Sequence, residues 1–225
     1  GLTLYMLSLR QGSFPAAYWP KDRIRVERLG EREFTTDGAT LYSTFCIACH
    51  GSNGQGLRYP GMPAFPAIAN PDFLAVASDE FIAATVNQGR QGRRMPAWGA
   101  KECGLRPEEV KAVIAHLRAL GGVSAPAPDT KPVRWIKGDT AAGGRLFATY
   151  CSGCHGAKGQ GVEGPALNNK VLLAGATDSY LLATIRRGRR GTVMDGFEKP
   201  STTHPALTQS EIETIVSYIR TWEKP

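Results

Sequence analysis

Two copies of one short motif constrain this chain more than any other feature. Residues 46–50 read Cys-Ile-Ala-Cys-His and residues 151–155 read Cys-Ser-Gly-Cys-His, so both have the C-x-x-C-H spacing that attaches a c-type haem. Two thiols three positions apart lie on one helical turn, where they can bond the two vinyl groups of one haem. The adjacent imidazole then lies beneath the iron. The sequence therefore predicts two covalent haems, attached through Cys46, Cys49, Cys151 and Cys154, with His50 and His155 as the proximal iron ligands.

The composition allows two small domains and a charged partner. With 225 residues, of which 42% are hydrophobic, the chain is long enough to bury two ordinary cores. The formal net charge is +7, and such an excess favours nucleic acid, an anionic membrane or an acidic protein as a partner. The haem propionates offset part of this charge and no nucleic-acid-binding motif accompanies it. We therefore expect a protein or membrane partner and no nucleic acid.

The chain contains an internal repeat whose two copies begin before the haem motifs. An offset of 105 positions pairs Gly38 with Gly143 and aligns the two motifs, each at the end of a segment with apolar residues at helical spacing. An offset of 99 then holds over residues 66–95. The change of offset implies six extra residues in the first copy, within the loop 56–65.

The repeat also defines domain boundaries. An offset of 102 aligns residues 109–120 with residues 211–222, and both segments are apolar at helical spacing with helix-start signals before them. Each copy thus opens and closes with a helix. The sequence predicts a first domain over 37–121, a Gly- and Pro-rich linker over 122–137, and a second domain over 138–225.

A sixth iron ligand must come from the opposite side of each haem, and the repeat selects two methionines for it. Met95 and Met194 occupy equivalent positions in Gly-rich loops before the closing helices, whereas Met6 and Met62 have no counterpart. A thioether is a soft, neutral donor that raises the reduction potential, which suits electron transfer rather than oxygen chemistry. Methionine as a filler of the core is the alternative, but the equivalence of the two positions favours ligation.

Three further matched pairs are expected around the haems. They are Pro66 and Pro165, Arg90 and Arg189, and Trp98 and Phe197. The prolines lie where a backbone carbonyl could accept a hydrogen bond from the ligating histidine. The arginines could pair with haem propionates, or they form a solvated basic loop that attracts an acidic redox partner. The aromatic pair is expected to pack near the distal loop.

Three other side chains have alternative roles. His116 falls opposite Tyr218 in the closing helix, which indicates a core or surface residue rather than a ligand. His204 lies in a loop lengthened by three residues after Met194 and is an alternative distal ligand. Cys103 has no cysteine left to pair with, so we expect a buried inert thiol, with a thiolate ligand in place of the first methionine as the alternative.

The N-terminal extension, residues 1–36, has no counterpart later in the chain. Its first nine residues, Gly1 to Leu9, are largely apolar and stop at Arg10. We expect this stretch to be the end of a membrane anchor, with a strand that packs on a partner as the alternative. The remainder of the extension is either a strap over the first domain or a docking arm in a larger complex.

The order of these features resembles class I cytochrome c, present here in tandem. The opening helix, C-x-x-C-H, Pro-x-Leu/Ile, Gly-rich loop with methionine and closing helix carry the resemblance, over about residues 37–120 and 138–224. The resemblance implies an all-α fold wrapped round each haem, His/Met ligation and a periplasmic or otherwise extracytoplasmic setting. Asp195 departs from the family pattern, in which proline often follows the methionine.

The resemblance also implies a function. We expect a dihaem cytochrome that relays single electrons between a donor and an acceptor protein, as a membrane-associated subunit of a quinol-oxidising or terminal oxidase respiratory complex, without independent catalysis. The alternative is a dihaem redox enzyme, such as a thiosulfate dehydrogenase or a peroxidase, in which one iron keeps an open or weakly held site.

Overall fold

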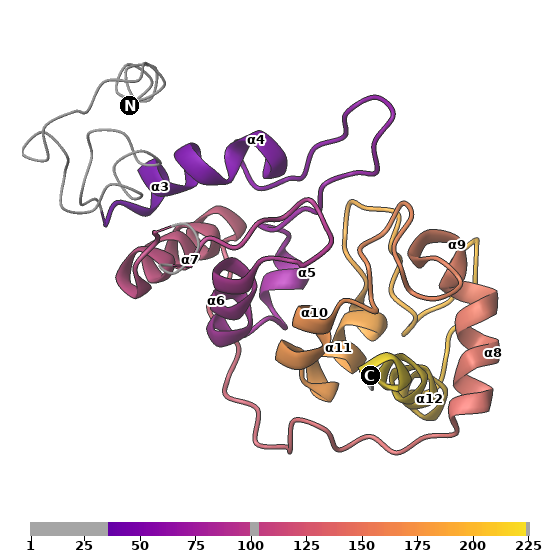
Figure 1. Ribbon diagram of the computed structural model, residues 1–225. Helices are drawn as coiled ribbons and strands as arrows, with labels where there is room; N and C mark the ends of the chain where they lie inside the picture. Colours follow the sequence, from indigo (N-terminus) through magenta and orange to yellow (C-terminus); the bar gives the residue numbers. More distant parts are fainter. Residues whose placement is uncertain (1–35, 100–103, 224–225) are drawn as a thin grey trace, which may run out of the picture.

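The described part of the chain forms two helical units that share one plan. The computed structural model describes residues 36–99 and 104–223 (Figure 1). The first unit contains α3 (Gly38–Phe45), α4 (Ile47–His50), α5 (Pro71–Leu74), α6 (Asp79–Gln88) and α7 (Pro107–Gly121). The second unit contains α8 (Thr140–Tyr150), α9 (Ser152–His155), α10 (Lys170–Gly175), α11 (Asp178–Arg187) and α12 (Gln209–Arg220), followed by the 3-10 turn η2 (Thr221–Glu223). Neither described range contains a strand, which confirms the predicted all-α fold.

Each opening helix crosses the closing helix of its own unit, α3 against α7 and α8 against α12. A glycine lies at each crossing. A Cβ atom at Gly38 would lie 2.1 Å from the carbonyl oxygen of Ala112, and one at Gly143 would lie 2.0 Å from the carbonyl oxygen of Thr214. No side chain fits at these distances, so the helices reach this separation only because the residue is glycine. This close approach explains why Gly38 and Gly143 are matched in the repeat.

The closing helices form the cores through the apolar residues that the periodicity selected. These residues are at most 3% exposed: Val110, Val113, Ile114 and Leu117 on α7, and Ile212, Ile215, Val216 and Ile219 on α12. Helix α12 begins with the capping box that Thr208 and Glu211 predicted, and Pro107 is the first residue of α7. Both closing helices therefore begin and bury the faces expected from sequence.

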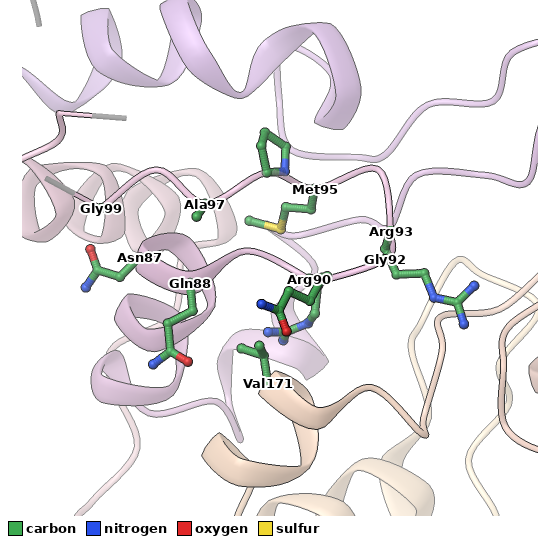
Figure 2. A pocket seen from close by; sticks show the side chains of 11 residues that line it. Asn87, Gln88, Arg90, Gly92, Arg93, Met95, Ala97, Gly99 and Val171 are labelled. Atoms are coloured by element: carbon green, nitrogen blue, oxygen red, sulfur yellow. The ribbon is translucent and has the colours of Figure 1, made fainter. Parts of the chain in front are cut away.

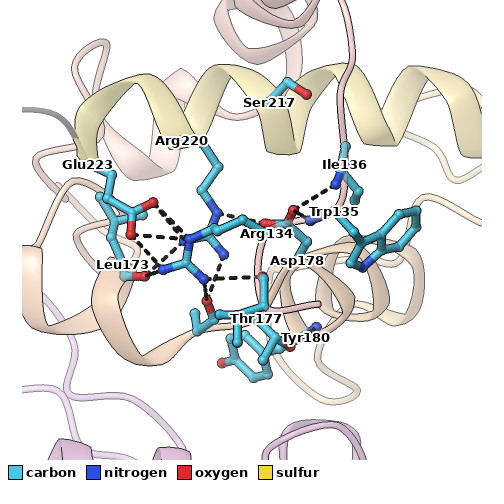
Figure 3. A network of polar contacts seen from close by, with 12 residues as sticks. Arg134, Trp135, Ile136, Leu173, Thr177, Asp178, Tyr180, Ser217, Arg220 and Glu223 are labelled. Carbon is cyan, nitrogen blue, oxygen red and sulfur yellow. Dashed lines mark hydrogen bonds and ion pairs between the residues drawn. The ribbon is translucent and has the colours of Figure 1, made fainter. Parts of the chain in front are cut away.

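A largely buried arginine ties each closing helix to the rest of its unit. Arg220 donates from Nε to Asp178 Oδ1 at 2.7 Å, and its Nη atoms donate to the carbonyl oxygens of Leu173 and Ala176 at 2.9 and 2.6 Å (Figure 3). Arg118 makes the equivalent hydrogen bonds in the first unit. Because these bonds satisfy carbonyl groups at the ends of short helices, each arginine holds α12 or α7 against the segment before α11 or α6.

The end of the predicted linker packs on the second unit. Asp178 Oδ2 accepts hydrogen bonds from the backbone N–H groups of Trp135 and Ile136 at 2.8 and 2.9 Å. Arg134 donates to the Leu173 carbonyl oxygen at 2.6 Å and forms an ion pair with Glu223 (Figure 3). Asp178 thus binds both Arg220 of the closing helix and the segment through which the chain enters the unit.

The two units contact each other through matched positions of the repeat. The rings of Phe81 and Tyr180, which correspond under the offset of 99, lie with centroids 4.5 Å apart. Arg58 and Glu163, which correspond under the offset of 105, form an ion pair between the units. When a residue meets its own counterpart, the two copies are related by an approximate two-fold axis that passes close to that residue pair.

Two asparagines make this relationship reciprocal. The Nδ2 group of Asn70 donates to the carbonyl oxygen of Arg190 at 2.8 Å, and the Nδ2 group of Asn169 donates to the carbonyl oxygen of Gln91 at 3.0 Å. Both the donors and the acceptors are related by the offset of 99. Each asparagine also caps its own short helix through Oδ1. The short helices α5 and α10 are therefore held against the Gly-rich loop of the opposite unit.

Two predictions fall outside the described residues. Gly1 to Leu9 and nearly all of the extension 1–36 precede the first described range, and Cys103 lies between the two described ranges. Within the described ranges, no helix combines the length and the apolar character that crossing a bilayer requires.

Candidate haem-binding sites

The first haem motif is presented on a short helical turn. Helix α3 ends at Phe45, and Cys46 both caps α3 and precedes α4, which ends at His50. His50 is 7% exposed, and its Nδ1 lies 2.9 Å from the carbonyl oxygen of Pro66. Because a carbonyl oxygen only accepts, Nδ1 carries the proton and Nε2 keeps its lone pair. This is the tautomer that binds iron through Nε2.

The second motif has the same geometry. Cys151 caps α8 and precedes α9, and the Nδ1 group of His155 donates to the carbonyl oxygen of Pro165 at 2.8 Å. Burial lowers the pKa of His155, although the hydrogen bond to Pro165 acts in the opposite direction. His50 shows the same shift for the same reasons. Both imidazoles are therefore held neutral at neutral pH, which is the form that ligates a metal.

Within the described ranges, the four cysteines of the two motifs form no disulfide. Burial raises the pKa of Cys46 and of Cys151 to about 12, and the neighbouring thiol of each motif adds to the shift. Unpaired thiols three residues apart, beside a neutral imidazole, are the groups that thioether attachment of a haem consumes.

The two predicted distal methionines lie in matched loops that follow α6 and α11. The backbone N–H of Arg90 donates to the carbonyl oxygen of Met95 at 2.9 Å, and that of Arg189 donates to the carbonyl oxygen of Met194 at 2.7 Å. A glycine precedes each arginine with φ of 63° or 67°, and a Cβ atom there would lie 2.6 or 2.5 Å from the methionine carbonyl oxygen. Each loop closes because that position is glycine.

A pocket of about 700 Å³ opens beside the first of these loops. The end of α6, the loop from Arg90 to Gly99 and Val171 of the opposite unit line it. Figure 2 shows Met95 and Arg90 on the loop, with Val171 of α10 beside Arg90. The pocket therefore lies at the contact between the units, next to the first methionine.

The two matched arginines are half-buried cations. Arg90 Nη2 donates to the Thr85 hydroxyl at 2.8 Å, and Arg189 Nη2 donates to the Thr184 hydroxyl at 3.0 Å. Burial lowers the pKa of Arg90 to about 10. Over the two described ranges, neither arginine forms an ion pair with a carboxylate. A guanidinium in this setting fits a haem propionate, which would supply the missing opposite charge.

The matched aromatic residues connect each loop with the helix before the haem motif. Trp98 contacts Phe45 with ring centroids 5.0 Å apart, and Phe197 contacts Tyr150 at 6.0 Å. Phe45 and Tyr150 immediately precede the first cysteine of each motif. The pair thus lies between the distal loop and the residues next to the attachment site.

The insertion in the first copy covers the first motif. The Tyr59 hydroxyl donates to the carbonyl oxygen of Ala48 at 2.7 Å, and the ring of Phe65 lies 6.4 Å from that of His50. The guanidinium of Arg94, in the methionine loop, lies 4.0 Å from the centroid of the Phe65 ring. The insertion therefore connects the first motif with the Met95 loop. The second domain lacks this insertion and so has no equivalent connection.

The two remaining histidines occupy different settings. His116 packs against the ring of Tyr42 at 5.3 Å, between the opening and closing helices. His204 stacks on Phe197 at 3.9 Å, and its Nδ1 donates to the carbonyl oxygen of Pro205 at 2.9 Å. Its Nε2 is buried and has no hydrogen-bond partner in the part of the chain that the structure describes.

Sequence reasoning assigned no role to several residues that the structure places at the contact between the units. Asn70 and Asn169 occupy matched positions of the repeat, and this match was the only sequence feature that could have indicated a shared role. Asp72 has no equivalent in the second copy, where the position is Val171. Its contacts across the units could not be found from the repeat alone.

Both halves of the chain match known families. Residues 140–223 match the family model described as cytochrome c, and residues 33–117 match the one described as subunit III of the cbb3-type cytochrome c oxidase. The chain is 34% identical over 172 residues to the cbb3-type cytochrome c oxidase subunit FixP of Bradyrhizobium sp., a match that covers 72% of this chain and 53% of that protein. It is 27% identical over 194 residues to subunit CcoP of the same type of oxidase from Rhodobacter capsulatus, with 81% and 60% covered.

A third relative is described by a different role. The thiosulfate dehydrogenase electron acceptor of Stutzerimonas stutzeri is 27% identical over 199 residues, and the match covers 84% of both chains. By contrast, the chain spans little more than half the length of the oxidase subunits, between 53% and 60%.

Proposed function

The chain is a dihaem c-type cytochrome with two tandem class I cytochrome c domains, and from this premise we propose that it relays single electrons between a donor and an acceptor protein. The observation that carries the proposal is the matched geometry of the two sites. In each, a carbonyl oxygen fixes a neutral histidine with Nε2 free, and a glycine-closed loop presents a methionine. Haem iron with histidine and thioether ligands supplies one-electron exchange and keeps no coordination position for a substrate.

The proposed roles follow the repeat. His50 and Met95 ligate the first iron, and His155 and Met194 ligate the second. The carbonyl groups of the matched prolines orient the imidazoles through Nδ1–H. Arg90 and Arg189 bind propionates, and Trp98 and Phe197 shield the distal loops. The proposed domains are 37–121 and 138–225, joined by the linker 122–137.

We further propose that the protein acts within a membrane-bound respiratory complex of the cbb3 oxidase type. The support is the identity to two oxidase subunits and the family match over residues 33–117. In this setting the haem domains lie on the periplasmic face and the N-terminal extension leads to the membrane. The net charge of +7 favours an acidic surface on the donor or acceptor.

A second candidate function has specific support. The relative described as a thiosulfate dehydrogenase electron acceptor matches over 84% of its length. The chain would then carry electrons from a sulfur-oxidising enzyme. In both cases it transfers electrons and does not itself transform a substrate, unlike the dihaem enzyme that the sequence left as an alternative.

The ligands are tested by replacing one methionine at a time in the intact holoprotein. Met95→Ala should abolish the thioether–iron absorption of the first haem and lower its potential, and Met194→Ala should do the same for the second. Met62→Ala is the control, because this methionine is 40% exposed and unmatched. Unchanged absorption in a loop variant would show that the ligand assignment is wrong.

The partner is tested by purification and kinetics. If oxidase subunits co-purify with the full-length protein from its native membrane, the respiratory complex is supported. Rapid reduction by a thiosulfate-oxidising enzyme, without such co-purification, would favour the second candidate. Binding of carbon monoxide to either haem at neutral pH would instead support the dihaem enzyme.

A further inference from the structure

The two sides of the contact between the domains make equivalent hydrogen bonds to the backbone, but they carry different charges. Helices α5 and α10 occupy equivalent places, and their capping residues Asn70 and Asn169 make equivalent hydrogen bonds to the opposite methionine loop. Two residues later the copies differ, because α5 carries Asp72 where α10 carries Val171. One domain thus presents a carboxylate at a point where the other presents an isopropyl group.

Asp72 binds the loop and helix end of the second domain. Its Oδ2 accepts a hydrogen bond from the backbone N–H of Arg190 at 2.9 Å, and its Oδ1 lies 3.3 Å from Arg190 Nη2 and 3.7 Å from Arg187 Nη2. The Asp72 side chain is only 7% exposed, whereas that of Arg190 is 81% exposed. Water therefore screens the arginine much more than the carboxylate.

Asp72 is ionised at neutral pH. Burial opposes its ionisation, but the hydrogen bonds from the Arg190 backbone and side chain, with the charges of Arg190 and Arg187, outweigh burial and lower its pKa. The next residue, Phe73, lies under the guanidinium of Arg189 at 5.6 Å. Residues 70–73 of the first domain thus contact three arginines that precede Met194, namely Arg187, Arg189 and Arg190.

The equivalent place on the other side is open and lacks this ion pair. Gln88 and Gln91 stand where the second domain has Arg187 and Arg190. They line, with Val171, the pocket of about 700 Å³ beside the first methionine loop, and no acidic residue is among its lining residues (Figure 2). The first loop therefore has neither the carboxylate nor the ionic contact that the second loop has.

We propose that Asp72 is a positioning residue that holds the methionine loop of the second domain and lowers the reduction potential of the second haem. The inference rests on the proposed electron-transfer function. The backbone N–H of Arg190 binds Asp72, and the backbone N–H of the preceding residue, Arg189, binds the Met194 carbonyl oxygen. A poorly screened negative charge at this point favours the oxidised state, which carries one more positive charge.

The test is a potentiometric titration of the intact holoprotein and four variants. Asp72→Asn removes a negative charge and should raise the potential of the second haem. Arg190→Gln removes a positive charge from the same ion pair and should lower that potential, by a smaller shift because Arg190 is more exposed. Asp72→Glu should retain most of the wild-type potential. Val171→Asn, at the equivalent place in the other domain, is the matched control and should shift neither haem in this way.

The opposite signs of the two expected potential shifts distinguish an effect of charge from an effect of loosening the methionine loop. Asp72→Asn and Arg190→Gln both remove the side-chain ion pair, and both leave a side-chain oxygen at position 72 for the backbone N–H of residue 190. A purely structural effect of losing the ion pair would therefore shift the potential in the same direction in both variants. Shifts of the same sign, equal shifts of both haems, or no shift in Asp72→Asn would overturn the proposal. Haem-methyl resonances, assigned with the two methionine variants, identify which haem has moved.

The wild-type titration tests the underlying function separately. Two reversible one-electron steps with intact thioether absorption support the cytochrome function whatever the variants do. Their absence would refute that function directly, and the variant shifts would then have no bearing on it.

Discussion

Replacing Gly143 with alanine should destabilise the second domain through a single added methyl group. The new Cβ would lie 2.0 Å from the carbonyl oxygen and 2.5 Å from the carbonyl carbon of Thr214, on the closing helix. Both atoms belong to the backbone, so α8 and α12 must move apart by more than about 1 Å to restore van der Waals contact. Such a movement would loosen the core that these helices share with the second haem motif.

The magnitude follows from two opposing effects. Overpacking of a well-packed contact costs up to about 3 kcal/mol, while alanine is about 1 kcal/mol more favourable than glycine inside a helix. The expected net loss is about 2 kcal/mol. For a domain of this size that loss corresponds to a decrease in Tm of roughly 8–16 °C.

The adjacent residue supplies a matched control. At Gly144 an added Cβ would lie 3.2 Å from Cε2 of Tyr218, a side-chain atom that can shift. Gly144→Ala should therefore be neutral or stabilise the domain by up to about 1 kcal/mol. The assay is thermal and guanidinium unfolding of the holoprotein, followed by far-UV circular dichroism. Equal stabilities of the two variants would refute the argument that backbone contact requires glycine at position 143.

Three further predictions concern charged residues. Asp178→Asn should cost the second domain about 3 kcal/mol in guanidinium unfolding, because it removes a fully buried carboxylate from its ion pair with Arg220. Asp79→Asn should cost about 1 kcal/mol or less, since the Asp79 side chain is 49% exposed. The pKa of Asp72 lies below its ordinary value of 3.8, so its stabilising contribution is present above that pH and is lost as the pH falls through the folded-state pKa. Small-angle scattering should then show acid-induced separation of the domains in the wild type, and Asp72→Asn should behave at neutral pH as the wild type does in acid. Arg90→Gln should lower the potential of the first haem more than Arg93→Gln, and equal shifts would contradict a specific propionate contact for Arg90.

The fold could be predicted because haem attachment and helix packing both require residues of a given type at fixed spacings in the sequence. The C-x-x-C-H spacing is fixed by the haem vinyl groups, and Val110, Val113 and Ile114 recur at the spacing of one helical face. The structure confirms the all-α fold and buries those residues. The repeat identifies Gly38 and Gly143 as equivalent, but only the structure shows that glycine at these positions permits two helices to touch.

Other features depend on contacts between distant segments. Composition indicated that residues 122–137 form an extended linker, yet it gave no sign that Trp135 and Ile136 would donate to Asp178. The role of Asp178 depends on three segments that meet in space. No sequence pattern within any one segment specifies these contacts. The sequence therefore predicted the linker but not the hydrogen bonds that attach its end to the second domain.

The repeat itself explains which contacts between the domains could have been anticipated. Once two copies face each other across an approximate two-fold axis, each contact implies its counterpart: the bond from Asn70 to Arg190 requires one from Asn169 to Gln91, and a residue near the axis meets its own equivalent. A fully symmetric pair of domains would give the two haems equal potentials and no preferred direction of electron movement. Unequal potentials must therefore arise where the copies differ. The insertion over the first motif is one such difference, and Asp72 in place of Val171 is another, at a buried position that contacts the methionine loop of the opposite domain.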